Sequence, residues 1–177
     1  MNFHLTPESS CKRLARDNSS LKRVTITGDG AQISECMFHH CEALQEVIIG
    51  DGITEIDSGA FDCCYQLGYI SIPQSVTRIG RMAFAFCIEL EEIELSDGLC
   101  CIEEYSFMRC SMLDNVVIPF SVEIIVESAF GGCVSLSAVS VPESITSISK
   151  TAFTDCPLLL KFSVITASEE ETDDEQD

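Results

Sequence analysis

The chain carries, at residues 67–84, the stretch Leu67-Gly-Tyr-Ile70-Ser-Ile72-Pro73-Gln-Ser-Val76-Thr-Arg-Ile79-Gly-Arg-Met-Ala83-Phe84. Ile70 and Ile72 alternate with polar side chains, and this pattern is typical of a short strand with one buried face. Pro73 lacks the N–H that a strand interior uses, so we expect the strand to end there. The rest of the stretch supplies two more inward-facing pairs, Val76 with Ile79 and Ala83 with Phe84.

The same positions recur every 23 residues along most of the chain. The aromatic position is Phe38, Phe61, Phe84, Phe107, Phe130 and Phe153. The cysteine position is Cys41, Cys64, Cys87, Cys110, Cys133 and Cys156. One aliphatic position is Ile33, Ile56, Ile79, Ile102, Ile125 and Ile148, and the first strand position is Val24, Val47, Ile70, Ile93, Val116, Val139 and Phe162. A fixed period of this length predicts a solenoid whose coils stack these residues into one shared core.

The pattern Leu-x-x-Ile-x-Ile-Pro-x-x-Val-x-x-Ile-x-x-x-Ala-Phe-x-x-Cys resembles the leucine-rich repeats of the BspA-like (Treponema pallidum type) subclass. The resemblance covers roughly residues 21–164. It implies a repeat solenoid, α/β in class by family: a right-handed coil with a parallel β-sheet on its concave face and otherwise mostly short strands and turns. It also implies protein binding, because members of the subclass include bacterial and protozoan surface proteins that adhere to host or matrix proteins.

These patterns divide the chain into three regions. Residues 1–20 form an N-terminal cap, in which Thr6-Pro7-Glu8 predicts the start of a short helix over roughly 7–16. Residues 21–164 form the solenoid of about six repeats. Its first unit departs from the pattern, because Gly30 stands where Ile53 stands later, so we expect a degenerate, capping repeat. Residues 165–177 form an acidic tail that we expect to be disordered.

Charge is the second informative property of the chain. The net charge is −19, and the acidic residues of the tail carry −7 of it. This sign disfavours direct binding to nucleic acid and allows a basic protein partner. The tail therefore supports an alternative function, an acidic chaperone or regulator of basic proteins, although a high net charge also simply keeps a sheet-rich rod soluble.

Residues 1–20 contain no apolar run of the secretory type, and no stretch approaches the ~20 apolar residues of a membrane span. We therefore expect a cytoplasmic or nuclear protein if the sequence is complete. If a leader is missing, an adhesin-like surface protein fragment at the extracellular surface is a further alternative. We expect a monomer without cofactors.

Eleven cysteines raise the question of disulfides and metals. Six of them occupy one repeat position, which favours packing of reduced thiols over a disulfide framework. The segment Cys36-Met-Phe-His39-His40-Cys41 is the best metal candidate. Zinc sites usually combine two separated pairs of Cys or His ligands, and the sequence offers no second pair to accompany this one. The vicinal pairs Cys63-Cys64 and Cys100-Cys101 offer only weak support for a redox switch. We predict no metal site.

Catalytic motifs are missing from the sequence. His4, His39 and His40 have no nucleophile at a recognisable motif spacing. Gly28-Asp-Gly30 lacks the lysine and the following helix of a phosphate-binding loop. We therefore predict a protein that is not an enzyme.

The outward strand positions form the predicted binding surface. They make two columns whose chemistry changes from coil to coil, unlike the core. The first column is Arg23, Glu46, Tyr69, Glu92, Asn115, Ala138 and Lys161, and the second is Thr25, Ile48, Ser71, Glu94, Val117, Ser140 and Ser163. The predicted partner contacts are Glu46, Ile48, Tyr69, Ser71, Glu92, Glu94, Asn115 and Val117. Aromatic residues anchor interfaces, and the carboxylates favour a basic partner.

Overall fold

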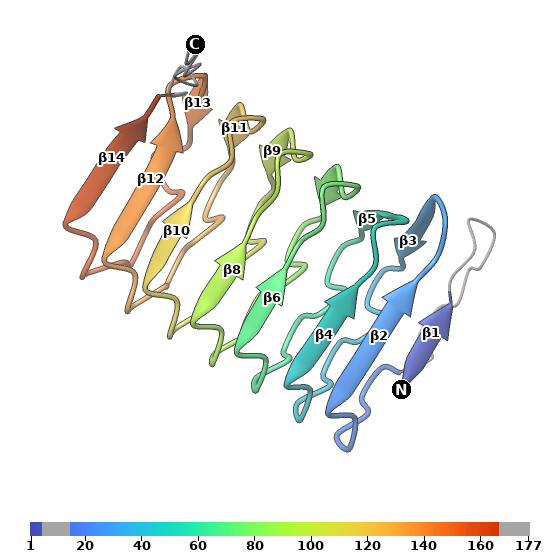
Figure 1. The fold of residues 1–177 in the computed structure, drawn as a ribbon. Helices are drawn as coiled ribbons and strands as arrows, with labels where there is room; N and C mark the ends of the chain where they lie inside the picture. The colour runs from blue at the N-terminus through green and yellow to red at the C-terminus, as the bar shows by residue number, and fades with distance from the viewer. Residues whose placement is uncertain (5–14, 167–177) are drawn as a thin grey trace, which may run out of the picture.

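The computed structural model describes residues 1–4 and 15–166. The chain winds as a solenoid whose coils stack side by side, with all paired strands parallel (Figure 1). One row of strands, the principal face, contains β1 (Asn2–His4), β2 (Arg23–Thr27), β4 (Glu46–Ile49), β6 (Tyr69–Ser71), β8 (Glu92–Glu94), β10 (Asn115–Val117), β12 (Ala138–Pro142) and β14 (Lys161–Ile165). The predicted parallel solenoid is confirmed.

A second row of strands, the minor face, was not predicted from the sequence. It contains β3 (Ala31–Ile33), β5 (Ile53–Ile56), β7 (Arg78–Ile79), β9 (Cys101–Ile102), β11 (Ile124–Ile125) and β13 (Ser147–Ile148). The described residues contain no helix. The predicted cap helix over roughly 7–16 falls largely on residues 5–14, outside the described part of the chain. Of the predicted tail, 165–177, residues 167–177 are also outside it, whereas Ile165 is the last residue of β14 and so belongs to the strand row. No described helix is long and apolar enough to cross a membrane.

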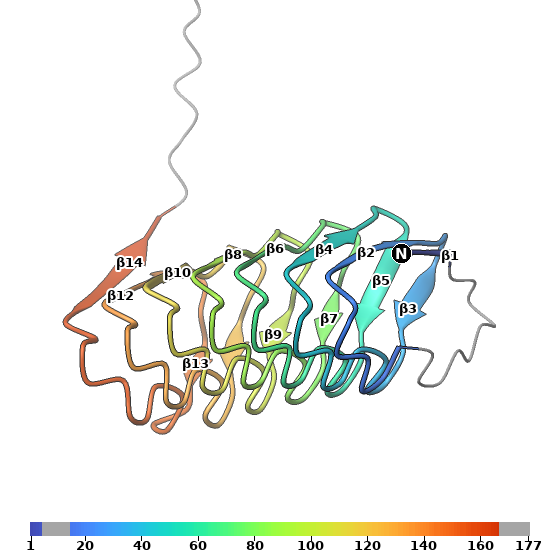
Figure 2. The ribbon, with the colours of Figure 1, turned by 90° about the horizontal axis from the view of Figure 1, so that it is seen from below.

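The third side of each coil consists of turns, which form one row along the rod (Figure 2). The repeated phenylalanine lies within a double turn in each coil, as at residues 58–63 around Phe61. Consecutive rings from Phe38 to Phe153 stack with centroids 5.1–5.4 Å apart and nearly parallel planes. The five rings from Phe38 to Phe130 are fully buried. The phenylalanine column is therefore the spine of the core.

Backbone hydrogen bonds join the double turns of neighbouring coils. In the coil around Phe84, the N–H groups of Met82, Phe84 and Phe86 all donate to carbonyls of the next coil, at 2.8–3.1 Å. The two outer residues of this trio have left-handed backbone, with φ of 56° and 57°. Left-handed backbone is disfavoured for side chains other than glycine. Here it aims every second N–H at the neighbouring coil, and the bonds formed offset its cost.

The repeated cysteines complete the turn row. Each thiol donates to a carbonyl 26 residues earlier: Cys64 to Phe38, Cys87 to Phe61, Cys110 to Phe84, Cys133 to Phe107 and Cys156 to Phe130, at 3.1–3.3 Å. A cysteine at this position is small enough for the core and still satisfies a buried carbonyl. The ten cysteines in the described part of the chain are free thiols.

Two details differ from the sequence-based expectation. Gly30 does not occupy the place of Ile53: buried Ala31 pairs with Ile53, and a register shift between Ala31 and Gln32 restores the repeat. Phe162, expected in the first inward column, is 49% exposed. It lies in the last described coil, where no further coil stacks against it, so the pattern alone could not bury it.

Both strand rows are interrupted at the same coil. The principal face divides into the sheets β1-β2-β4-β6-β8 and β10-β12-β14, and the minor face into β3-β5-β7 and β9-β11-β13. In the coil that contains β8 and β9, β8 therefore pairs only with β6 of the preceding coil, whereas β9 pairs only with β11 of the following coil. The turn row continues across both breaks, because Phe84 stacks on Phe107 at 5.4 Å and Phe107 stacks on Phe130 at 5.3 Å.

An arginine spans the break in the minor face. Arg78 of β7 lies 2.8 Å from Glu103, just beyond β9, and 3.5 and 3.6 Å from Asp57 and Glu55 of the preceding coil. Partial burial works against its charge, but these three carboxylates raise the pKa of Arg78 above its ordinary value. These ion pairs connect the sheet β3-β5-β7 to the coil of β9, between which no strand pairing exists.

The stacked spine predicts a position-dependent loss of stability. Phe84→Ala should lower the free energy of unfolding by about 3–5 kcal/mol, because it removes a ring that stacks on both sides. Phe153→Ala, at a half-buried terminal position, should cost less than half as much. Urea unfolding followed by circular dichroism measures both, and equal losses would contradict a cooperative spine.

Thiol burial predicts selective reactivity. Burial raises the pKa of Cys64 and Cys87 well above that of a free thiol, so little thiolate forms at pH 8. Exposed Cys100 should react with iodoacetamide more than about tenfold faster than these two in the native protein. Peptide mass spectrometry of timed samples reads out each site, with a urea-unfolded sample, in which all should react, as the control. Equal native rates would show that the turn row opens readily.

The arginine bridge predicts a salt-dependent contribution. Arg78→Gln should destabilise the protein by about 0.5–1 kcal/mol at low salt, since it leaves three carboxylates without their counter-charge. The effect should shrink in 1 M NaCl as screening weakens both the attraction and the residual repulsion. Arg81→Gln is the control, because that side chain is more exposed, forms one ion pair, with Glu104 at 3.4 Å, and otherwise lies over the Tyr105 ring at 5.2 Å. A salt-independent loss would point to packing instead.

Candidate protein-binding face

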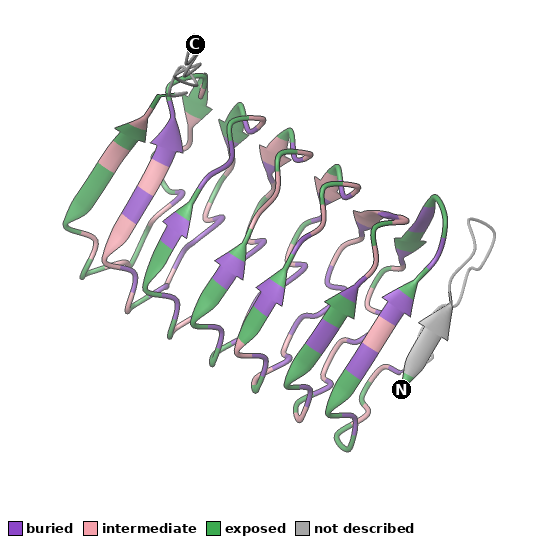
Figure 3. Cartoon of the chain, viewed as in Figure 1, coloured by how far each residue is buried: buried purple, intermediate pink, exposed green. Residues whose placement is uncertain are grey.

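The principal face presents all of the predicted contact residues to solvent. The strands alternate buried and exposed residues, with the exposed ones outward (Figure 3). The eight predicted contacts are exposed on β4, β6, β8 and β10. The structure brings them together as two neighbouring columns, since Glu46 pairs with Tyr69 in register and Tyr69 with Glu92. Their role in binding stays a prediction.

Polar contacts fix several of these side chains. Arg23 forms an ion pair with Glu46 at 2.9 Å, so the positive charge of Arg23 offsets Glu46 rather than Glu92 or Glu94 further along the face. Hydrogen bonds from the hydroxyls of Tyr69 and Ser71 lower the pKa of Glu94, and the same contact raises the pKa of Tyr69. The lowered pKa favours the charged carboxylate of Glu94 on this face.

Two cavities lie on this face. One of about 390 Å³ lies at the break between β8 and β10, and its lining includes Glu92, Glu94, Leu95, Asp97, Val117 and Phe120. A second, of about 290 Å³, lies between β4 and β6 beside Ile48, Tyr69 and Pro73. Both are lined by exposed apolar side chains together with carboxylate groups, Glu92, Glu94 and Asp97 in the first and Asp51 in the second.

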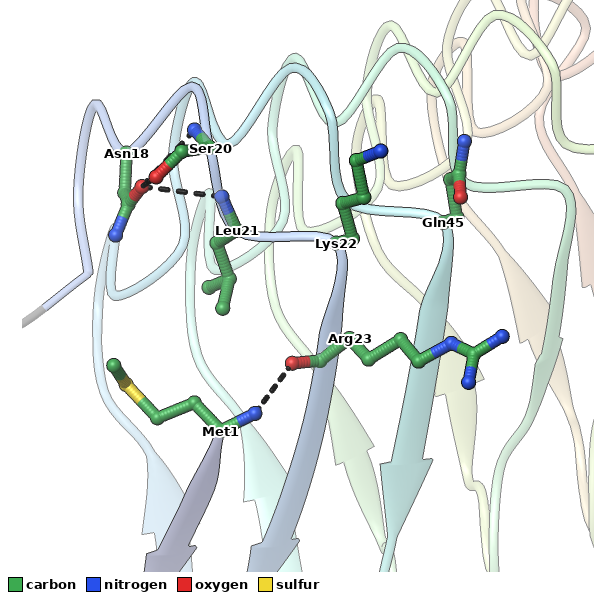
Figure 4. A pocket seen from close by; sticks show the side chains of 7 residues that line it. All are labelled: Met1, Asn18, Ser20, Leu21, Lys22, Arg23 and Gln45. Carbon is green, nitrogen blue, oxygen red and sulfur yellow. Dashed lines mark hydrogen bonds between the residues drawn. The ribbon is translucent and has the colours of Figure 1, made fainter.

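A third cavity, of about 570 Å³, lies at the N-terminal end of the rod (Figure 4). The Asn18 side chain there accepts hydrogen bonds from the N–H groups of Ser20 and Leu21 and from the Ser20 hydroxyl. The terminal amine of Met1 donates to the Arg23 carbonyl at 2.9 Å. These bonds close a turn and attach β1 to β2, and no residue lining the cavity is a histidine, cysteine, aspartate or glutamate that could act as a catalytic base.

The histidines and cysteines that the sequence offered as metal ligands do not converge on a common point in the described part of the chain. Nε2 of His39 lies 3.3 Å from Asp62, and burial is the main cause that lowers the pKa of His39. Within residues 1–4 and 15–166, no group of three metal-ligating side chains is arranged to hold an ion. Burial raises the pKa of Cys63 to about 11, which makes that thiol a poor nucleophile at neutral pH.

Sequence reasoning missed the cavity at the sheet break. Leu95, Asp97 and Phe120 lie outside the two predicted columns and contribute to it from the loops after β8 and β10. The repeat gives no signal for the break, because the period between Ile93 and Val116 is still 23 residues. Only exposed Phe120, directly after a proline where other units carry polar residues, hinted at a special loop.

Comparisons with known proteins agree with this architecture. The family described as BspA type leucine rich repeat region matches residues 13–119 and 100–172, with 6 copies of the repeat. No curated protein matches the chain.

Three solved structures share the fold. A leucine-rich cell surface protein from Faecalibacterium prausnitzii is 22% identical with a TM-score of 0.54, and the alignment covers 84% of this chain and 61% of that one. The leucine-rich repeat protein of T. pallidum is 22% identical with a TM-score of 0.51, covering 93% and 64%. The pneumococcal vaccine antigen PcpA is 18% identical with a TM-score of 0.58, covering 96% and 46%.

The present chain thus spans between about half and two thirds of the length of these structures. At these identities the likeness concerns the fold. The family match, by contrast, extends over most of the chain and rests on the same 23-residue unit that builds the turn row. The chain belongs to the BspA-type leucine-rich repeat family.

Proposed function

We propose that this protein is a non-enzymatic interaction module that binds a partner protein through the principal face. The observation that carries the proposal is the pair of exposed columns on β4 to β10, where chemistry changes from coil to coil above an invariant core. Exposed Ile48, Tyr69 and Val117, at 44–55% exposure, are apolar groups that a bound partner would remove from water.

Two further points support this function. The two cavities on the face are lined by groups suited to recognition, and neither contains a histidine or cysteine next to a hydroxyl nucleophile. The fold is also that of a cell surface protein and of a vaccine antigen, whose exposure to other proteins suits a binding role. The partner is expected to present basic groups, because Glu92 and Glu94 dominate the centre of the face.

The proposal predicts that one capture experiment separates this face from the rest of the molecule. The full chain, a face variant and a control variant are used to capture proteins from a native lysate, and captured proteins are quantified by mass spectrometry. The face variant is Tyr69→Ala/Glu92→Lys/Glu94→Lys. The control is Ile124→Ala/Glu123→Lys/Glu127→Lys on and beside the minor face, which makes the same change of charge and also removes one exposed apolar group.

We expect at least one protein to be captured by the parent and the control and lost from the face variant. Equal capture by all three chains would contradict binding through the principal face. Capture only of basic proteins, lost from all chains in 0.5 M salt, would instead favour the acidic tail as the binding element.

A further inference from the structure

The structure assigns the cavity at the sheet break a specific role: we propose that it binds an extended segment of a partner protein that carries a lysine or arginine next to an aliphatic or aromatic side chain. This inference rests on the proposed function of the principal face and names what that face recognises. We call the cavity the break groove. Its two walls lie in residues 92–97 and 115–120, and Ile165 at the end of β14 also lines it.

The groove exists because the strands on either side of it are not paired. β6 and β8 pair at all three of their residues, and each of the three residues of β10 pairs with β12, whereas β8 and β10 belong to different sheets. The loop after β10 is joined to the loop after β8 by a hydrogen bond from the Phe120 N–H to the Asp97 carboxylate, at 2.9 Å. The groove therefore lies where strand pairing stops although the 23-residue repeat continues.

The two walls differ in chemistry. Glu92, Glu94 and Asp97 contribute carboxylates from one wall, and no lysine, arginine or histidine lines the groove. Val117 and Phe120 contribute apolar surface from the other wall and are 55% and 40% exposed. A ligand that satisfies both walls must carry a cation and an apolar group a few ångströms apart, which neighbouring residues of a peptide provide.

Other occupants fit less well. The volume of about 390 Å³ lies near the low end of the roughly 300–1,000 Å³ of ligand pockets, so the groove has room for a few side chains of a partner protein. A second copy of this chain brings another net charge of −19 toward the acidic wall. The chain's own last residues, Ala-Ser-Glu-Glu-Glu-Thr-Asp-Asp-Glu-Gln-Asp, offer one alanine and no cation. Charge complementarity therefore favours a basic and apolar segment of a different protein.

The test is a selection from a displayed library of random linear 12-residue peptides against the immobilised full chain in 0.15 M salt. Recovered peptides are measured by fluorescence polarisation on three proteins: the parent, a groove variant Glu92→Gln/Val117→Ser and a control Glu123→Gln/Ile124→Ser. Each variant loses one carboxylate and one exposed aliphatic side chain, the groove variant on β8 and β10 of the principal face and the control on and beside β11 of the minor face.

We expect recovered peptides to carry lysine or arginine within two residues of an apolar side chain. They should bind the groove variant at least tenfold more weakly than the parent and bind the control unchanged. Replacing the peptide's apolar residue by serine should weaken binding to the parent by a similar factor. Amide chemical-shift changes in the full chain should centre on residues 92–97 and 115–120.

Three results would overturn the inference. These are recovery of no binding peptide, equal affinity for the groove variant and the parent, and binding that survives loss of the peptide's apolar residue, which would reveal simple adsorption to an acidic protein. The proposed function is tested separately. A captured partner that is lost from the face variant but retained by Glu92→Gln/Val117→Ser would support binding through the principal face and contradict binding in the break groove.

Discussion

The contact between successive double turns is the interaction on which the rest of this structure depends. Each coil has few residues in regular strands, and some minor-face strands are two residues long. Continuity comes from the turn row, where two or three N–H groups of each coil from Phe38 to Phe130, a stacked phenylalanine and a cysteine thiol contact a neighbouring coil. A coil without a neighbour leaves these groups unsatisfied, so the coils are stable only as a stack.

This constraint explains why strain and unusual residues are tolerated at the turns. Phe86, Tyr105 and Arg109 keep left-handed backbone although glycine would adopt it more easily. The bonds to the next coil need that backbone, and they are the same in coils that use glycine, as at Gly132. The side chains of these residues point outward and vary, while the backbone they support does not.

Because the turns join neighbouring coils, the strand rows can be interrupted without separating the coils, unlike the strands of a sheet that has no other connection. The principal face is interrupted between β8 and β10 without loss of the solenoid, and the minor face is interrupted one coil earlier, where Arg78 joins the blocks. An interruption in a sheet usually exposes polar backbone and is disfavoured. Here the interruption between β8 and β10 coincides with the break groove, so this concave feature of the surface arises where strand pairing is least regular.

The sequence by itself determined the coil. A period of 23 residues fixes which side chains stack, and alternation within each strand fixes which side chains face solvent, so the parallel solenoid, its phenylalanine spine and the exposed columns followed from local pattern alone. Only the tertiary structure decided the second row of strands, the register shift at Ala31, the exposure of Phe162 and the groove lined by Phe120. The physical reason is that these features depend on contacts between neighbouring coils: whether two adjacent strands pair, and whether a further coil is there to cover a side chain. Identical spacing in the sequence permits both a paired and an unpaired neighbour.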